Sequence, residues 1–174
     1  MKPNHLKLSS ERLTLIPYTT TICVEILDNN FKTITELGLK PGKLWPDADI
    51  IETIPRIIKN INKVGLPTGF ESWMIIKSDT NEIIGDIGFK GFNRITSSAD
   101  IGYGIIASER RNGYAIEACK TLIEWAFQNE SLKSITAACL LDNVGSANLL
   151  EKLNFEKNAV DEEFYYWILE KNKS

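Results

Sequence analysis

Residues 99–115 read ADIGYGIIASERRNGYA, and this stretch decides the fold. Residues 99–105 form a β-rich run, and an amphipathic helix follows from Ala115. The turn between them carries Arg110-x-x-Gly113-x-Ala115. A helix N-terminus presents unpaired N–H groups and a positive dipole end, and small residues at 113 and 115 let the main chain close on a bulky anion. The stretch therefore predicts a strand, a turn and a helix that form a pyrophosphate cradle.

Other phosphate-binding motifs do not fit this sequence. It contains no Gly-Lys-Ser/Thr of a P-loop, and Gly102-x-Gly104 lacks the third glycine of a dinucleotide fingerprint. The simpler alternative for residues 110–115 is a strand-to-helix turn in which Gly113 only sets a backbone angle.

A second polar group follows the next expected strand. The apolar run 134–140 leads into Asn143-Val144-Gly145-Ser146, which opens a short helix over 146–153. Because Asn143 and Ser146 are three residues apart, their side chains either cap this helix or face the crevice at the carboxyl end of the strand.

The rest of the chain predicts a single α/β domain over residues 1–174, with an antiparallel meander that enters a βαβ crossover. Thr19, Thr20 and Thr21 offer cap hydroxyls to the first helix, and Asp47 or Asp49 is an expected cap of the third. Pro55 either kinks this third helix or marks its first turn. A longer loop is expected over 93–98. The expected strands span 13–17, 72–77, 82–89, 99–105, 134–140, 155–160 and 164–169; the expected helical segments span about 19–27, 31–39, 47–61, 115–128 and 146–153.

Composition excludes several classes of function. The chain has 174 residues with 20 Lys+Arg against 23 Asp+Glu, so it lacks the basic field of a nucleic-acid-binding protein. Its one histidine, His5, lies almost at the N-terminus. A Ser-His-Asp triad, a Cys-His pair and a His-rich zinc site are therefore not expected, and neither is any other metal site.

The cysteines and the apolar pattern predict the compartment. Cys23, Cys119 and Cys139 are widely spaced without a CxxC pair, which argues against a zinc ribbon or a disulfide framework. No signal-like segment and no run of ~18 apolar residues is present, so a cytoplasmic protein without a membrane partner is expected.

Taken together, these motifs resemble the RimJ/RimL-like branch of the GNAT N-acetyltransferase superfamily. Residues 110–115 match its Arg/Gln-x-x-Gly-x-Gly/Ala signature, and residues 143–155 are similar to its Asn-x-x-Ser…Glu-Lys-x-Gly-Phe run, with Asn154 in place of the glycine. Asparagine tolerates the left-handed conformation at such a position. The segments 11–15, 83–89 and 100–103 resemble strands of that branch.

The resemblance implies an acetyl-CoA-dependent N-acetyltransferase with a mostly antiparallel sheet of about seven strands, in which a neutral amine attacks the thioester directly. The pantetheine arm would enter where strands 99–105 and 134–140 splay apart. The main-chain amides of Arg111 to Ala115 would hold the pyrophosphate, and Ser146 would sit near the sulfur. The implied cofactor-binding residues are Ile105, Arg110, Arg111, Asn112, Gly113, Tyr114, Ala115, Asn143 and Ser146.

Catalysis needs a base for the amine and a proton for the departing thiolate. Asp100 is the leading base, because it aligns with an acidic position of the family's fourth strand; Asp86 and Glu71 are the next candidates. The alternative for Asp100 is a solvated or salt-bridged strand residue. Many members place a general-acid tyrosine where this chain has Leu150, so Ser146 or water is expected to take that role.

The acceptor stays open: a protein or peptide N-terminus, or a small amine. A homodimer is also compatible with the resemblance. The alternative function is a non-catalytic GNAT-like acyl-CoA-binding sensor or scaffold, and Leu150 at the tyrosine position is the feature in its favour.

Overall fold

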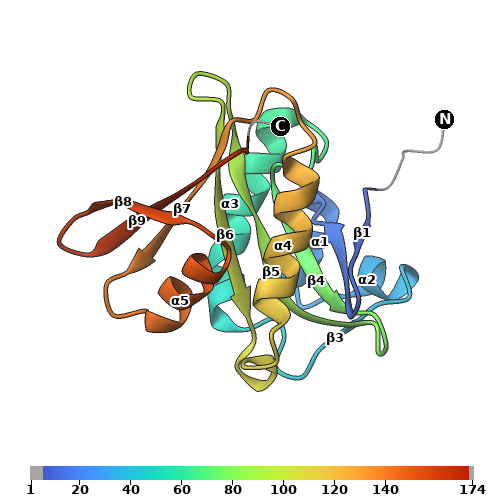
Figure 1. Ribbon diagram of the computed structural model, residues 1–174. Coiled ribbons are helices and arrows are strands. Elements are labelled where there is room, and N and C mark those ends of the chain that lie inside the picture. Colours follow the sequence, from blue (N-terminus) through green and yellow to red (C-terminus); the bar gives the residue numbers. More distant parts are fainter. Residues whose placement is uncertain (1–5, 173–174) are drawn as a thin grey trace.

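The computed structural model describes residues 6–172, which form a nine-stranded mixed sheet with helices on both faces (Figure 1). His5 lies outside the described residues. The strand order is β1-β2-β4-β5-β6-β7-β9-β8, with β3 paired to β5. The strands are β1 (Leu8–Ser9), β2 (Leu13–Pro17), β3 (Lys40–Pro41), β4 (Ser72–Lys77), β5 (Glu82–Asn93), β6 (Ser98–Ile105), β7 (Ser134–Leu140), β8 (Glu156–Val160) and β9 (Phe164–Glu170).

Five α-helices and one 3₁₀ turn cover the sheet. They are α1 (Thr20–Leu27), α2 (Lys32–Glu36), α3 (Ala48–Val64), the 3₁₀ turn η1 (Ala107–Glu109), α4 (Tyr114–Ala126) and α5 (Val144–Lys152). In Figure 1, α4 crosses the near face of the sheet in front of β5, whereas α1 and α3 lie behind it. The predicted mixed α/β architecture is confirmed. The sheet has more than the expected seven or so strands because β1 and β3 are two-residue pairings, too short to leave a periodic pattern.

The first helices begin at side-chain caps. Thr19 accepts a hydrogen bond from the N–H of Ile22, and Asp47, rather than Asp49, accepts one from the N–H of Ile50. Pro55 lies inside α3, which continues past it to Val64. The isoleucines at helical spacing form the buried face of α3, namely Ile50, Ile54, Ile57 and Ile61.

The expected loop over 93–98 is a tight hairpin instead, because β5 extends to Asn93 and β6 begins at Ser98. Asn93 Oδ1 accepts hydrogen bonds from the N–H groups of Ile95 and Thr96, and Ser97 takes a positive φ of 54°. The Asn93 side chain thus satisfies two N–H groups of the turn and allows the chain to reverse within a few residues.

One parallel pairing sets the position of the site. Strands β6 and β7 are joined through the crossover helix α4 and pair only from Ser98↔Ser134 to Asp100↔Thr136. Beyond these pairs the two strands part, and Figure 1 shows β7, β9 and β8 leaving the rest of the sheet as a separate blade. The predicted splay between the two segments is therefore present.

Within residues 6–172, no helix combines the length and the apolar character needed to cross a membrane.

Candidate active site

The crevice between β6 and β7 has an unpaired main-chain edge. Ile106 donates its N–H to the carbonyl of Ile84, and pairing with β5 alternates along β6. The main-chain groups of Tyr103 and Ile105 therefore face β7, where pairing has already ended at Asp100. A cavity of about 240 Å³ lies between the strands.

The loop before α4 has a run of open amides. Arg111 and Gly113 take positive φ values of 63° and 79°, and Gly113 is the N-cap of α4. Within the described part of the chain, no N–H from Arg111 to Ile116 donates a hydrogen bond. These amides border a second cavity of about 380 Å³ between the start of α4 and α5. The loop thus concentrates unpaired donors at a positive helix end, which is how proteins bind pyrophosphate.

Two side chains of the signature support the loop itself. Arg110 donates from Nε to the carbonyl of Ile105 at 2.9 Å, which leaves the N–H of Ile105 as the open group at the end of β6. Asn112 Nδ2 donates to the carbonyls of Glu109 and Arg110. Asn112 is therefore placed to hold the turn, while Arg110 also borders the cavity.

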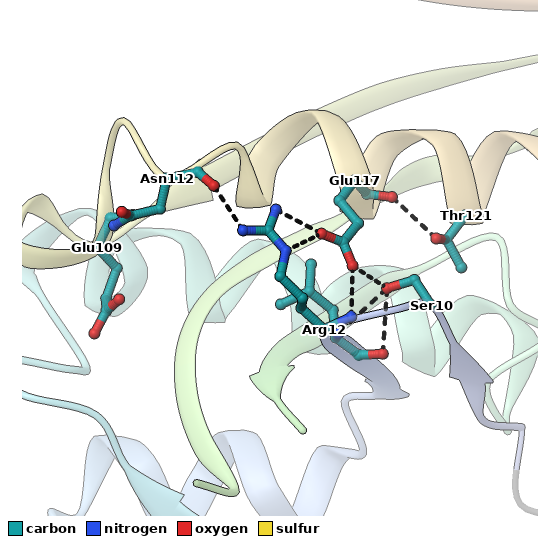
Figure 2. A network of polar contacts seen from close by, with 7 residues as sticks. Ser10, Arg12, Glu109, Asn112, Glu117 and Thr121 are labelled. Atoms are coloured by element: carbon teal, nitrogen blue, oxygen red, sulfur yellow. Dashed lines mark hydrogen bonds and ion pairs between the residues drawn. The ribbon is translucent and has the colours of Figure 1, made fainter. Parts of the chain in front are cut away.

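A polar network joins the first strands to this loop (Figure 2). Arg12 Nη1 donates to the carbonyl of Asn112 at 2.9 Å, and Arg12 Nε donates to Glu117 at 2.7 Å. Ser10 Oγ and the N–H of Arg12 also donate to Glu117. The Arg12 guanidinium lies 4.7 Å from the centre of the Tyr114 ring. Burial works to raise the pKa of Glu117, but these hydrogen bonds hold it below its ordinary value, so the pair stays charged.

The start of α5 lies across the crevice from β6. Asn143 caps α5 by accepting the N–H of Ser146, and both residues line the cavity between β6 and β7. Capping and facing the crevice, the two sequence alternatives, are thus combined. The hydroxyls of Ser146 and Tyr103 lie 2.7 Å apart. Leu150, at the position of the family's tyrosine, is buried at the back of this cavity.

On the opposite face of the sheet, a cavity of about 300 Å³ lies between α3 and strands β4 to β6. Gly102 and Gly104 of β6 leave its floor open, and Asp86 stands on β5 opposite Gly104. Burial raises the pKa of Asp86 to about 7; Asp47 adds to this effect and Arg56 opposes it. A carboxyl group with such a pKa exchanges protons near neutrality.

The other acidic candidates are engaged. Asp100 forms an ion pair with Lys90 and accepts a hydrogen bond from Thr136 at 3.0 Å, at the last paired position of β6 and β7. Glu71 is buried and accepts hydrogen bonds from the N–H groups of Thr68 and Gly69. The geometry places Asn143 and Ser146 at the crevice, the loop amides at the cavity between the starts of α4 and α5, and Asp86 on the other face of the sheet.

Sequence reasoning missed two residues. Arg12 was read as part of the opening strand, and only its place beside Glu117 across the fold reveals its reach toward the loop. The sequence gives Tyr103 no role beyond its place in the expected strand 99–105, and the structure brings its hydroxyl to 2.7 Å from that of Ser146.

The donor set suits coenzyme A. The open amides fit a pyrophosphate, and the unpaired edge at Tyr103 and Ile105 fits the amide groups of a pantetheine arm. Within residues 6–172, no three His, Cys, Asp or Glu side chains are grouped so as to hold a metal ion.

Comparisons with known proteins show which family the chain belongs to. The acetyltransferase (GNAT) domain model of the RimJ/RimL-like type matches residues 12–156. The uncharacterized N-acetyltransferase YjdG of Bacillus subtilis is 38% identical over 165 residues, which cover 92% of this chain and 96% of YjdG.

Two solved structures share the fold. RimL, a ribosomal L7/L12 alpha-N-protein acetyltransferase in complex with coenzyme A, superposes with a TM-score of 0.69 at 16% identity, over 95% of this chain and 98% of that one. The ribosomal-protein-S5-alanine acetyltransferase of Vibrio fischeri gives a TM-score of 0.65 at 17% identity, over 95% and 96% of the two chains. Homologues with this fold bind acetyl-CoA or coenzyme A. The family match, the relative and the site agree, and the chain belongs to the GNAT family as a RimL-like N-acetyltransferase.

Proposed function

We propose that this protein transfers the acetyl group of acetyl-CoA to a primary amine, either a protein or peptide N-terminus or a small amine, in the cytoplasm. The observation that carries the proposal is the run of open amides from Arg111 to Ile116 beside the parted strands β6 and β7. A main-chain anion site next to an unpaired strand edge is what a long, phosphate-bearing, amide-containing ligand requires.

The cofactor would lie across two elements. The amides from Arg111 to Ala115 are proposed to hold the pyrophosphate, with Arg110, Asn112 and Tyr114 shaping the loop around it. The N–H of Ile105 and the side chain of Asn143, which keeps its Nδ2 donor after capping α5, are proposed to bind the pantetheine arm.

Acetyl-CoA would supply the activated thioester. The N–H of Tyr103 faces the crevice and is proposed to polarise the thioester carbonyl. We propose Asp86, rather than Asp100, as the group that accepts the proton of the amine. Asp86 lines a cavity that also reaches Tyr103 and Gly104, whereas the carboxylate of Asp100 is held by Lys90.

The departing sulfur needs a proton donor. Ser146 is proposed to stand beside it and to donate through its hydroxyl, with Tyr103 as the next hydroxyl behind it. Burial raises the pKa of Tyr103 above its ordinary value, so this hydroxyl stays protonated at neutral pH. The hydroxyl pair would then take the place that Leu150 leaves without a polar group.

A free-thiol release assay tests the proposal. Purified protein is incubated with acetyl-CoA and a panel of amines that includes peptides with free N-termini, amino acids and simple alkylamines. Acetylation predicts thiol release above the hydrolysis background with at least one amine, together with an acetylated product by mass spectrometry. Tight binding of acetyl-CoA with background release for every amine would instead favour the sensor or scaffold function.

The two base candidates are separated by a matched pair of variants. Asp86→Asn and Asp100→Asn each remove one charge with little change of shape. If Asp86 is the base, its variant loses at least ~100-fold in kcat, and the Asp100 variant loses much less. The reverse order would restore Asp100 as the base.

A further inference from the structure

One face of α3 carries a row of polar side chains along the cavity of about 300 Å³ between α3 and strands β4 to β6. Asp49, Thr53, Arg56 and Asn60 all line this cavity, and their spacing of three or four residues places them on one side of the helix. Lys63 continues the same line into the adjoining cavity of about 500 Å³. The order from the start of α3 is therefore acidic, neutral, basic, neutral, basic.

Most other charges around these cavities are neutralised within the protein. The ammonium of Lys90 is paired with Asp100, and the carboxylate of Glu71 accepts hydrogen bonds from the N–H groups of Thr68 and Gly69. By contrast, the side chains of Asp49 and Arg56 make no ion pair or hydrogen bond with the residues between 6 and 172. Asp49 and Arg56 thus remain as opposite charges available to a ligand in the cavity of about 300 Å³, and Lys63, which forms no ion pair within residues 6–172, adds a cation beside the adjoining cavity.

Asp49 and Arg56 lie at different positions along α3. Asp49 stands at the first turn of α3 and, with Asp86, borders the small recess beside Gly104. Arg56 follows seven residues later, about 10 Å along the helix axis. A ligand whose amine lies between Asp49 and Asp86 would therefore extend along α3 toward the guanidinium of Arg56.

We infer that the acceptor is an amine that carries an anionic group, a carboxylate or a phosphate, several bonds from its nitrogen, and that Arg56 is the residue that selects it. This inference rests on the proposed acetyl transfer and names the substrate class of the same site. Arg56 presents a planar guanidinium, which binds a carboxylate or a phosphate through paired hydrogen bonds.

Matched ligands test the inference. Linear ω-amino acids of two to six carbons are compared with their own amides, and an aminoalkyl phosphate is compared with the parent amino alcohol. The wild-type protein is expected to show at least a tenfold higher kcat/KM for the anionic member of one or more pairs. The carboxylate and phosphate arms show which anionic group is preferred.

Arg56→Gln is expected to bring this ratio close to one, because it removes the cation that binds the anionic group. Both members of a pair are measured at the same pH, so a change in the pKa of Asp86 affects them alike and leaves the ratio unchanged. Lys59→Gln is the control, because Lys59 is an exposed cation on the same helix that does not line the cavity. The inference would be overturned if the wild-type protein had equal kcat/KM for the anionic and the neutral member of every pair, or if Arg56→Gln left their ratio unchanged.

Calorimetric binding of the same pairs in the presence of coenzyme A gives a readout that needs no turnover. The anionic member is expected to bind at least tenfold more tightly to wild type than to Arg56→Gln. Preferential binding without thiol release for any amine would contradict the proposed function alone. Thiol release without a preference for anionic amines would contradict this inference alone.

Discussion

Arg12 and Glu117 are 105 residues apart in the sequence, yet both Nε and Nη2 of Arg12 lie 2.7 Å from Glu117 Oε2. The Arg12 side chain is 45% exposed, so the ion pair itself contributes at most about 1 kcal/mol to folding. Its consequence is positional. With Glu117 holding one side of the guanidinium, Nη1 is fixed on the carbonyl of Asn112, and the amides of the loop turn away from it.

Replacing Arg12 should therefore weaken cofactor binding more than folding. We expect Arg12→Ala to raise the Kd of coenzyme A about tenfold by calorimetry, because the loop must then be ordered by the ligand. Arg12→Lys should recover little of this loss, since an ammonium cannot make the three directed contacts. Arg94→Ala removes an exposed arginine from the β5–β6 hairpin and is expected to bind normally. Equal affinity in Arg12→Ala and Arg94→Ala would refute the positional role.

Gly113 gives a second test of the loop. At a φ of 79°, any side chain is strained, and a Cβ here would lie 3.4 Å from Arg12 Nη2. Gly113→Ala should cost about 1 kcal/mol in unfolding and at least tenfold in coenzyme A affinity. Gly65→Ala is the matched control, because Gly65 has a φ of 82° at the end of α3 and open space around it. Because the ψ of Gly65 is −55°, outside the left-handed well that Gly113 occupies at a ψ of 8°, Gly65→Ala should be destabilised in urea at least as much, with unchanged affinity. Gly113→Asp should abolish binding, because a carboxylate would face the pyrophosphate.

The pKa of Asp86 predicts a pH dependence of activity. A general base acts in its deprotonated form, so kcat/KM should rise with pH through about 7 and level off above it. The charged or titratable groups that act on Asp86 are Asp47, Asp49 and Arg56 of α3, and Tyr18, whose own pKa is raised by burial and by Asp86. Arg56→Gln removes the one cation among them and should move the midpoint upward. A flat profile between pH 5.5 and 8.5 would exclude this role.

The same carboxyl group predicts a pH dependence of stability. The folded pKa of Asp86 lies above its unfolded value, so the folded state binds the extra proton between about pH 4 and 7. The contribution to stability is present below pH 4 and is lost as the pH rises through 7. Asp86→Asn should therefore stabilise the protein at pH 8, by roughly 2–4 kcal/mol, and by much less at pH 4. Urea unfolding of both proteins at pH 4 and pH 8 measures this effect. An equal change in the free energy of unfolding at the two pH values would contradict a raised pKa of Asp86 in the folded state.

Tyr103 and Ser146 should behave as one unit. Ser146→Ala and Tyr103→Phe are each expected to lower kcat about 10- to 100-fold with little change in the KM for acetyl-CoA, and the double variant should be no worse than the poorer single one. Tyr166→Phe removes an exposed hydroxyl that donates to Asp161 and serves as the control. Multiplicative losses in the double variant would show that the two hydroxyls act separately.

Much of the fold could be predicted because its elements leave local signals. The cap at Thr19, the isoleucine stripe of α3 and the left-handed Asn154, with a φ of 64°, are properties of short segments. The short pairings of β1 and β3 were not predictable, since two residues carry no period. The length of the β5–β6 turn depended on one side chain, Asn93, satisfying two N–H groups.

The candidate site was harder to predict, because the role of each acidic side chain depends on neighbours that are distant in the sequence. Asp86 and Asp100 are both acidic residues within apolar strands, and the resemblance to the family places Asp100 first. Lys90 and Thr136 engage Asp100, whereas Asp86 is half-buried beneath α3 and forms no ion pair within residues 6–172. These neighbours come from distant parts of the chain, so only the assembled fold distinguishes the two carboxyl groups.

The short pairing of β6 with β7 has a mechanical consequence. Three residue pairs, the connection through α4, the Thr136–Asp100 hydrogen bond and core packing hold the blade of β7, β9 and β8 to the remaining sheet. Beyond these pairs the edge of β6 is open, so amide exchange at Tyr103 and Ile105 should be fast. A ligand lying along this edge acts as a missing strand, so it would slow this exchange and raise the melting temperature of both halves together. The rigidity of the protein would then increase with the concentration of coenzyme A.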